Sequence, residues 1–177
     1  MTHCSCIMGK IYYTSFDSSF GLVFVAKTLK GICDVTFSDI SEVKFISSLR
    51  KSLRKEIVRE DKVFGETKKV LLDYFDGCRK DFKLPLDLSM GTQFQRKVWR
   101  KVMEIPYGEL RSYKWVAGEI GSTNASRAVG NAVGVNPVPP IVPCHRVVCS
   151  DGGLGGYSSG ISIKKRLLRL EGIPEIG

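Results

Sequence analysis

The chain is poor in the residues and spacings that bind metals. Its 177 residues include only two histidines, and no two of its six cysteines have the Cys-x-x-Cys spacing that is typical of zinc sites. His3, Cys4 and Cys6 are grouped near the start and would form only a fragment of such a site. We therefore predict no bound metal and no other cofactor.

Long hydrophobic runs are also absent. No apolar stretch reaches the ~20 residues that cross a bilayer, and the residues up to Lys10 lack the apolar core of a signal peptide. The cysteines follow no disulfide-framework spacing. We expect an intracellular protein with reduced thiols and no membrane association, in the nucleus of a eukaryote or the cytoplasm or nucleoid of a prokaryote.

Basic residues outnumber acidic ones, and the formal net charge is +9. Residues 89–177 carry 12 Lys and Arg against 6 Asp and Glu, without a long basic run of the kind found in localisation tails. The excess therefore belongs to a folded surface and favours a polyanionic partner. Charge alone leaves nucleic acid, a membrane surface and an acidic protein open.

Hydrophobic periodicity predicts an α+β fold whose first half is an antiparallel β-sheet with helices. Three β-rich runs at 10–16, 22–26 and 32–37 are separated by short turns, as in a meander. Apolar residues then recur three or four positions apart over 43–57 and again over 66–75, which predicts two helices. Strands followed by helices indicate a small α+β unit.

The second half is predicted to be mainly helical. Residues 80–91 have the composition of a connector, and Thr92 is placed to cap a helix that ends near Pro106. Two short helices over 112–120 and 125–134 follow, joined by a Gly-Ser-Thr-Asn turn. A helix, a tight turn and a second helix are typical of helix-turn-helix DNA readers and also of small helical bundles.

The helix over 125–134 carries one long cation, Arg127, among small residues. Ala125, Ala128 and Gly130 are three of these, and they allow a rigid partner to approach the backbone closely. The partner is either a neighbouring helix or a nucleic-acid groove. Because a lone arginine suits a packed core poorly, we favour the groove, with Arg127 as a probe into it or into a vacated base position.

The segment Ile141-Val142-Pro143-Cys144-His145-Arg146-Val147-Val148 places a cysteine beside a histidine between aliphatic pairs. A free thiol titrates near pH ~8.5, so nucleophilic use needs neighbours that stabilise the thiolate, and His145 and Arg146 are candidates. The alternative is an inert core cysteine. We favour a reactive thiol, because packing alone does not explain a polar Cys-His-Arg centre between apolar flanks.

A third group is needed to orient His145. Glu171, near the end of the last predicted helix, is the preferred candidate, and Glu104, Glu109 and Glu119 remain open. Neighbours in an extended segment point to opposite faces, so the thiol and imidazole would meet only through a turn or a bridging water.

The chain between Arg127 and Cys144 is short and stiffened by prolines. The thiol must therefore lie close behind the helix that carries Arg127. A thiol in that position cannot reach an atom inside a stacked duplex, so the target nucleotide would have to rotate out into a pocket.

Several motifs together resemble the O6-alkylguanine-DNA alkyltransferase family. They lie within about 91–173 and are Gly91-Thr92-Gln93-Phe94-Gln95, Ile105-Pro106-Tyr107-Gly108, Ser112-Tyr113, Arg127-Ala128-Val129-Gly130, Asn136-Pro137, Pro143-Cys144-His145-Arg146-Val147 and Gly155-Gly156-Tyr157-Ser158. The resemblance implies an RNase H-like α+β domain over 1–85. It also implies a winged-helix-like DNA-binding and alkyltransferase domain, containing the helix-turn-helix, over 91–177.

The same resemblance implies DNA repair by direct, irreversible transfer of an alkyl group from O6-alkylguanine to Cys144. Each molecule would act once, since no second nucleophile is evident that would release the thioether. The damaged nucleotide would be flipped out of double-stranded DNA by the helix-turn-helix bound in the minor groove. A one-use protein needs no partner subunit, so we expect a monomer.

The resemblance also implies residue roles. His145, through water, and Glu171 would lower the pKa of Cys144, Tyr113 would donate a proton or hydrogen bond to the leaving guanine, and Asn136 would brace the turn before the active site. The implied DNA contacts are Arg127, Ser122, Ala125, Ala128, Gly130 and Tyr113. The implied pocket wall is Val147, Val148, Gly155, Gly156, Tyr157 and Ser158.

Two other functions remain open. A module that binds damaged DNA without chemistry would have no need of Cys144. A cysteine hydrolase that uses Cys144, His145 and Glu171 would turn over many times, but the neighbouring sequence has no evident oxyanion site.

Overall fold

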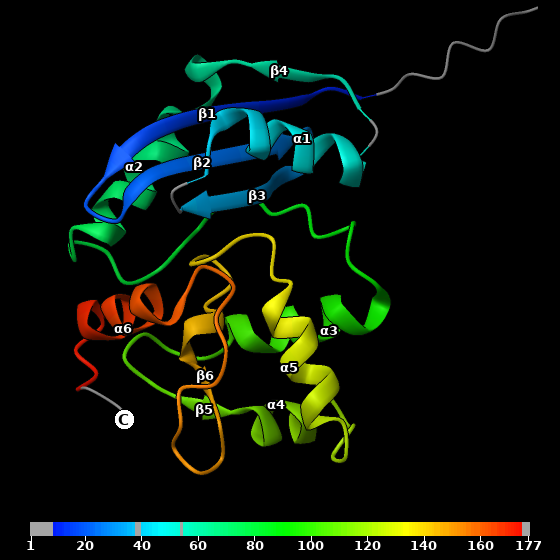
Figure 1. Cartoon of the computed structure of the whole chain (residues 1–177), viewed down its shortest axis with the longest axis vertical. Coiled ribbons are helices and arrows are strands. Elements are labelled where there is room, and N and C mark those ends of the chain that lie inside the picture. The colour runs from blue at the N-terminus through cyan, green and yellow to red at the C-terminus, as the bar shows by residue number, and fades with distance from the viewer. Residues whose placement is uncertain (1–8, 38–39, 54, 175–177) are drawn as a thin grey trace, which may run out of the picture.

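The computed structural model describes residues 9–37, 40–53 and 55–174. A four-stranded sheet with two helices forms the N-terminal half, and a mainly helical C-terminal half lies against it (Figure 1). The predicted α+β class is thus confirmed. Within the described residues, no helix combines the length and the apolar character needed to cross a membrane.

The predicted antiparallel meander is present. Its strands are β1 (Ile11–Ser18), β2 (Gly21–Thr28) and β3 (Gly31–Phe37). Successive side chains of β2 alternate between the faces of the sheet, so Val23 and Val25 join one buried cluster while Phe24 and Ala26 join another. Both faces of the sheet are therefore covered.

A fourth strand, β4 (Ile57–Arg59), pairs parallel to β1 and gives the order β3-β2-β1-β4. The predicted end of the first helix, at residue 57, was wrong, because α1 (Glu42–Leu53) stops before this strand. Ile57 keeps a spacing of four from Leu53, which suits a helix, but it pairs instead with Ile11 of β1. Hydrogen-bonded pairing with β1 therefore outweighs the helical spacing of the apolar residues.

The two helices of this half cover opposite faces of the sheet (Figure 1). They are α1 and α2 (Gly65–Phe75), and the 3₁₀ turn η1 (Asp61–Phe64) leads into α2. Phe45 and Leu49 of α1 pack with Phe24, whereas Leu71 and Phe75 of α2 belong to the cluster on the other face. The face under α2 is the one that meets the C-terminal half.

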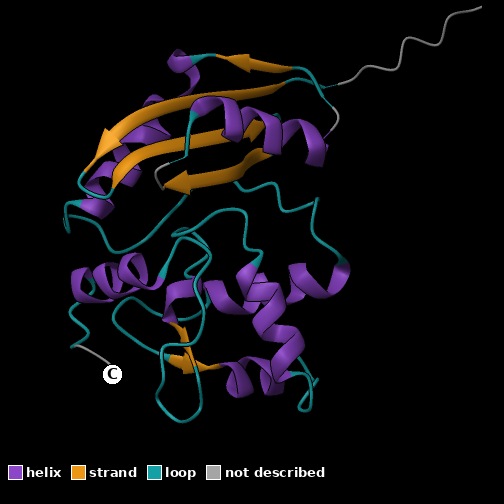
Figure 2. Cartoon of the chain, viewed as in Figure 1, coloured by secondary structure: helices purple, strands orange, loops and turns teal. Residues whose placement is uncertain are grey.

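The C-terminal half is mainly helical with one small parallel sheet (Figure 2). Its elements are α3 (Gln93–Met103), β5 (Arg111–Ser112), α4 (Tyr113–Glu119), α5 (Ser126–Gly134), η2 (Cys144–Arg146), β6 (Val147–Val148) and α6 (Ile161–Leu170). Thr92 caps α3 as predicted, and Gln95 completes a capping box. The two short predicted helices are α4 and α5, each beginning within one residue of its expected position.

One buried cluster runs through both halves. Val25, Phe37 and Phe75 from the N-terminal half share it with Val98 and Val142 from the C-terminal half. Within the C-terminal half, α3 is tied to α5 by a hydrogen bond from Trp99 Nε1 to the Ala132 carbonyl, 2.8 Å long. The helix that carries Arg127 is therefore held by buried apolar side chains and not by its turn alone.

The outer edge of β3 is paired with the connector between the halves and with a loop of the C-terminal half. The N–H of Ile32 donates to the Pro85 carbonyl at 2.8 Å, and the N–H of Asp87 donates back to the Ile32 carbonyl at 2.8 Å. Further along, the N–H of Val35 donates to the Pro137 carbonyl at 2.8 Å. The loop that leads to Cys144 is thus hydrogen-bonded to the edge of the N-terminal sheet.

Candidate active site

Cys144 begins the 3₁₀ turn η2 and does not lie in an extended strand. The N–H of Arg146 donates to the Pro143 carbonyl at 3.0 Å and closes this turn. The side chain of Cys144 is only 3% exposed and belongs to the core cluster that spans both halves. The backbone here is thus a turn and not an extended segment, and the expected meeting of thiol and imidazole stays a prediction.

Asn136 connects the thiol to the preceding loop. Its Nδ2 donates to Cys144 Sγ at 3.1 Å and to the Val142 carbonyl at 2.8 Å, and its Oδ1 accepts from the N–H of Val138 at 3.1 Å. The residue is 8% exposed, so these bonds are shielded from water. Asn136 is therefore both a turn residue and a donor to the sulfur.

Burial raises the pKa of the Cys144 thiol above its ordinary value. The neighbouring Asn136 amide, Tyr157 hydroxyl and Lys164 ammonium offset only part of this effect. Desolvation dominates this pKa and the imidazole is engaged with Glu171, so the expected effect of His145 and Glu171 on the thiol, relayed through water, stays a prediction. The resting thiol is protonated at neutral pH, and its use as a nucleophile requires a base.

His145 is fully buried and bound to Glu171, with 2.8 Å between Nε2 and Oε1. Burial lowers the pKa of His145 more than the carboxylate raises it, so the ring is neutral at pH 7. The bond to the carboxylate assigns the proton to Nε2. Nδ1 is then an acceptor, and it is buried without a hydrogen-bond partner among the described residues.

Glu171 follows α6 directly and is also buried. Arg146 binds it through both oxygens, with Nε at 2.9 Å from Oε2 and Nη2 at 2.8 Å from Oε1, and the N–H of Gly108 donates to Oε2 at 3.1 Å. Burial alone would raise the pKa of Glu171, but the bonds from His145 and Arg146 hold it well below its usual range. Arg146 therefore serves the carboxylate and not the thiol.

The other glutamates considered for this role lie elsewhere. Glu104 and Glu119 bind Lys101, at 2.7 Å and 3.4 Å, and Glu109 binds Arg111 at 2.6 Å. Glu171 is the one of the four that contacts His145.

Two further residues of the site were not predicted. Tyr74, in α2 of the N-terminal half, donates from its hydroxyl to Glu171 Oε1 at 2.6 Å. Lys164 of α6 is fully buried and donates from Nζ to the carbonyls of Val147, at 2.6 Å, and Leu154. Burial lowers the pKa of Lys164 to about 8. The periodicity of α6 could have indicated Lys164, which falls on its buried face, whereas nothing local indicates Tyr74.

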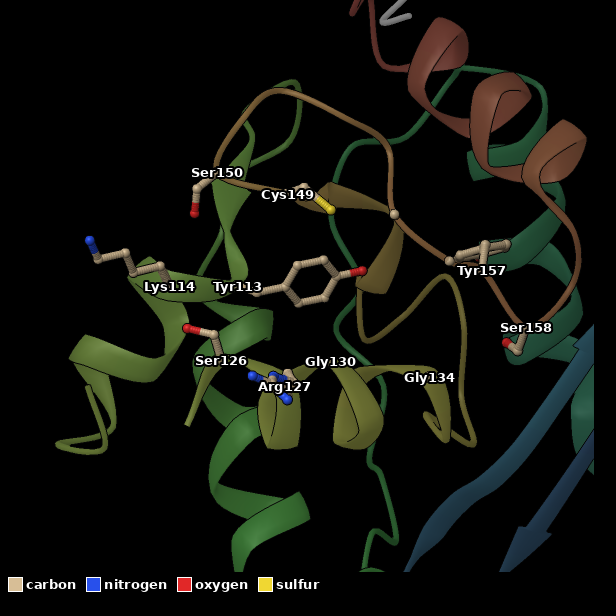
Figure 3. Close-up of a pocket in the computed structure, with 12 residues that line it drawn as sticks. Tyr113, Lys114, Ser126, Arg127, Gly130, Gly134, Cys149, Ser150, Tyr157 and Ser158 are labelled. Carbon is tan, nitrogen blue, oxygen red and sulfur yellow. The ribbon is translucent and has the colours of Figure 1, made fainter. Parts of the chain in front are cut away.

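A pocket of about 520 Å³ opens between α5 and the loop after β6 (Figure 3). The predicted residues that line it are Tyr113, Arg127, Gly130, Gly155, Gly156, Tyr157 and Ser158, and those not predicted are Lys114, Ser126, Gly134, Cys149 and Ser150. Figure 3 shows the ring of Tyr113 between Cys149 and α5. Cys144 is not in the lining, but its neighbour Tyr157 is.

Other predicted residues do not reach this pocket. Val147 and Val148, expected in its wall, are buried in β6, which pairs with β5, and neither belongs to the pocket lining. Ser122, Ala125 and Ala128 belong to the turn and first residues of α5, outside the pocket lining. Ala128 and Arg127 are exposed and open to a partner, whereas Gly130 is half-buried and faces the ring of Tyr113 in α4.

Among the described residues, no group of three or more His, Cys, Asp or Glu side chains is arranged to hold a metal ion. His3, Cys4 and Cys6, the fragment considered from the sequence, lie outside the described residues.

Comparison with known proteins identifies the class. A family model described as "6-O-methylguanine DNA methyltransferase, DNA binding domain" matches residues 93–173, and one described as "6-O-methylguanine DNA methyltransferase, ribonuclease-like domain" matches residues 11–88. The chain belongs to this family of DNA methyltransferases. The DNA-repair methyltransferase expected from the motifs is thereby confirmed as the class of the protein.

Relatives and solved structures agree over nearly the whole chain. The methylated-DNA–protein-cysteine methyltransferase of Methanosarcina acetivorans is 39% identical over 166 residues, covering 92% of this chain and 99% of the relative. That of Methanosarcina barkeri is 41% identical and covers 91% of this chain and 97% of the relative. The crystal structure of Mycobacterium tuberculosis OGT in complex with DNA is 37% identical with a TM-score of 0.79, and the match covers 90% of this chain and 92% of that one.

Proposed function

We propose that Cys144 takes the alkyl group from O6-alkylguanine in double-stranded DNA, in an irreversible reaction that each molecule performs once. The observation that carries the proposal is a buried thiol that accepts a hydrogen bond from Asn136 and directly precedes, in the turn η2, a neutral His145 held by Glu171. No other thiol of the described residues adjoins such a base–carboxylate pair. The new thioether is left without a second nucleophile to release it.

The proton path follows from the charge states. The thiol is protonated at rest because burial raises its pKa, and the neutral His145 has an unpartnered Nδ1 that can accept the proton through a water molecule. The sulfur then attacks the alkyl carbon while the bond to guanine O6 breaks. The electron pair passes to the guanine, and Tyr113 donates a proton or hydrogen bond to it, since burial raises the pKa of Tyr113 and keeps it protonated.

The geometry of α4 and α5 supports a minor-groove helix-turn-helix that flips the damaged nucleotide. Arg127 is exposed and also lines the pocket, so it is placed to fill the gap that an extruded base leaves. Ser122, Ala125, Ala128 and Gly130 would let the DNA backbone approach α4 and α5 closely.

The pocket would hold the extruded guanine. Its size falls within the range of small-molecule sites, and Gly155 and Gly156 leave room for a purine beside Tyr157 and Ser158.

We also propose that the chain consists of one domain over 1–85 and a DNA-binding and alkyltransferase domain over 91–177, and that it acts as a monomer. The two family models, which meet near residue 90, support this division.

The decisive experiment incubates the protein with a duplex that contains one O6-methylguanine and measures the intact mass and then the modified peptide. We expect one methyl group per molecule, on Cys144, and none in Cys144→Ala. Cys78→Ala is the matched control, because Cys78 is exposed and would be modified first if accessibility governed the reaction.

Three outcomes would contradict the proposal. Binding of the duplex without a mass gain would favour a module that only recognises damage. A methyl group on another cysteine would remove Cys144 from its role. Repeated turnover of a chromogenic ester would favour a hydrolase.

A further inference from the structure

Tyr74 belongs to the N-terminal half, yet its hydroxyl lies in the active site. The side chain is fully buried at the end of α2. Its hydroxyl donates to Glu171 Oε1 at 2.6 Å and lies 3.3 Å from His145 Nε2. Burial, and after it the charge of Glu171, raises the pKa of Tyr74 well above its ordinary value, so the hydroxyl remains a donor.

The two oxygens of Glu171 have different partners. Oε2 accepts from Arg146 Nε and from the N–H of Gly108, whereas Oε1 accepts from Tyr74, His145 and Arg146 Nη2. The oxygen that holds the imidazole is therefore shared with the tyrosine. This bond is the shortest that Glu171 accepts, and it comes from the other half of the chain.

We propose that Tyr74 is a positioning residue for alkyl transfer, whose hydroxyl fixes Glu171 Oε1 against His145 Nε2. The inference rests on the proposed function, in which neutral His145 accepts the proton of Cys144. Through Tyr74 the N-terminal half takes part in the chemistry, although it lies outside the DNA-binding domain.

The hydroxyl acts on His145 through the charge of the carboxylate. A donated hydrogen bond draws negative charge away from the imidazole, so its removal leaves the carboxylate freer to stabilise the imidazolium. The pKa of His145 then rises. As the pH falls, the imidazole is therefore protonated, and stops acting as a base, at a higher pH than in the wild type. Glu171, Arg146 and Lys164 act on His145 directly, and Tyr74 lies beside it. The other titratable groups of this cluster are Tyr107, which interacts with Glu171 and Arg146, and Tyr157, which interacts with Tyr74, Glu171 and Cys144.

The ring of Tyr74 has a separate, structural part to play. It packs against Phe82, Phe75 and Tyr107, with centroids at 4.7, 5.8 and 6.4 Å. Tyr74→Phe keeps this packing and removes the hydroxyl alone. Tyr13→Phe is the matched control, because Tyr13 also donates to a carboxylate, Glu42 at 2.8 Å, but in the cluster on the other face of the sheet.

The experiment measures the single-turnover rate of methyl transfer from an O6-methylguanine duplex between about pH 5 and 9, together with duplex affinity and melting temperature. For Tyr74→Phe we expect a rate roughly tenfold lower at neutral pH, an acidic limb displaced to higher pH, and unchanged duplex affinity. Tyr13→Phe should keep the wild-type limb even if its melting temperature falls.

Two results would overturn the inference. One is a Tyr74→Phe profile that superimposes on that of the wild type. The other is a uniform loss of rate that follows the melting temperature without displacing the acidic limb, which would assign Tyr74 a purely structural part. A wild-type protein that gains no methyl group on Cys144 would instead refute the proposed function itself, independently of any variant.

Discussion

Asn136 donates a hydrogen bond to the sulfur of Cys144 over 3.1 Å, and the same amide nitrogen holds the Val142 carbonyl. One side chain thus shapes the loop and stabilises the thiolate. Its donor is one of the few influences that counter the burial of the thiol.

Replacing Asn136 by alanine should raise the pKa of Cys144 further and slow methyl transfer about tenfold or more, because a donor to the thiolate is lost. The measurement is the rate of iodoacetamide modification against pH, followed by the rate with the alkylated duplex. Asn136→Asp should be slower still, since a carboxylate beside the sulfur repels the thiolate. Equal thiol titrations in all three proteins would contradict this role.

Gly155→Ala should restrict the size of the alkyl group that reacts. A Cβ at Gly155 would lie 2.9 Å from the Tyr113 hydroxyl and 3.3 Å from Cys149 Sγ, and the backbone there has a φ of +67° that alanine tolerates poorly. We expect benzyl transfer to fall at least about tenfold more than methyl transfer. Gly156→Ala, where the added methyl group meets nothing within 4 Å, should lose much less.

Arg127→Ala should slow methyl transfer from duplex DNA by about tenfold or more and leave transfer from free O6-benzylguanine nearly unchanged, because only the duplex requires extrusion. Lys97→Ala, which removes one positive charge from the exposed face of α3, is the control for simple electrostatic attraction. Equal losses on duplex and free base would place Arg127 in the chemistry and not in the extrusion.

Glu171→Gln should destabilise the fold by about 3–5 kcal/mol, because the buried Arg146 loses its charged partner. The folded-state pKa of Glu171 lies below its unfolded value, so its contribution is fully present above about pH 4.3 and is lost as the pH falls toward the folded-state pKa. Urea unfolding should show the difference from wild type shrinking on acidification. Glu119→Gln, which breaks a surface pair with Lys101, should cost less than about 1 kcal/mol.

The parts of the fold that could be predicted are those encoded by neighbours in sequence. The β-rich run of β2, the cap at Thr92 and the glycine turn between α4 and α5 are local signals, and each is present where expected. Ile57 shows the limit. Its spacing suits the preceding helix, and only the distant strand β1 determines that it joins a sheet.

The site divides in the same way. Cys144 and His145 could be singled out because they interrupt an apolar run. The pKa of Cys144 could not be predicted, since it depends on how deeply the surrounding residues bury the sulfur. Tyr74 was missed because its contact with Glu171 joins residues 97 positions apart.

The hydrogen bonds along β3 affect how readily one molecule associates with another. An unpaired outer strand can recruit a strand from another molecule, and here the segment near Pro85 and the loop at Pro137 occupy that position. The segment near Pro85 and the loop that leads to Cys144 therefore also protect this edge of the sheet from pairing with another molecule. An isolated N-terminal fragment that lacks these segments would expose the unpaired edge of β3, which could then pair with another molecule.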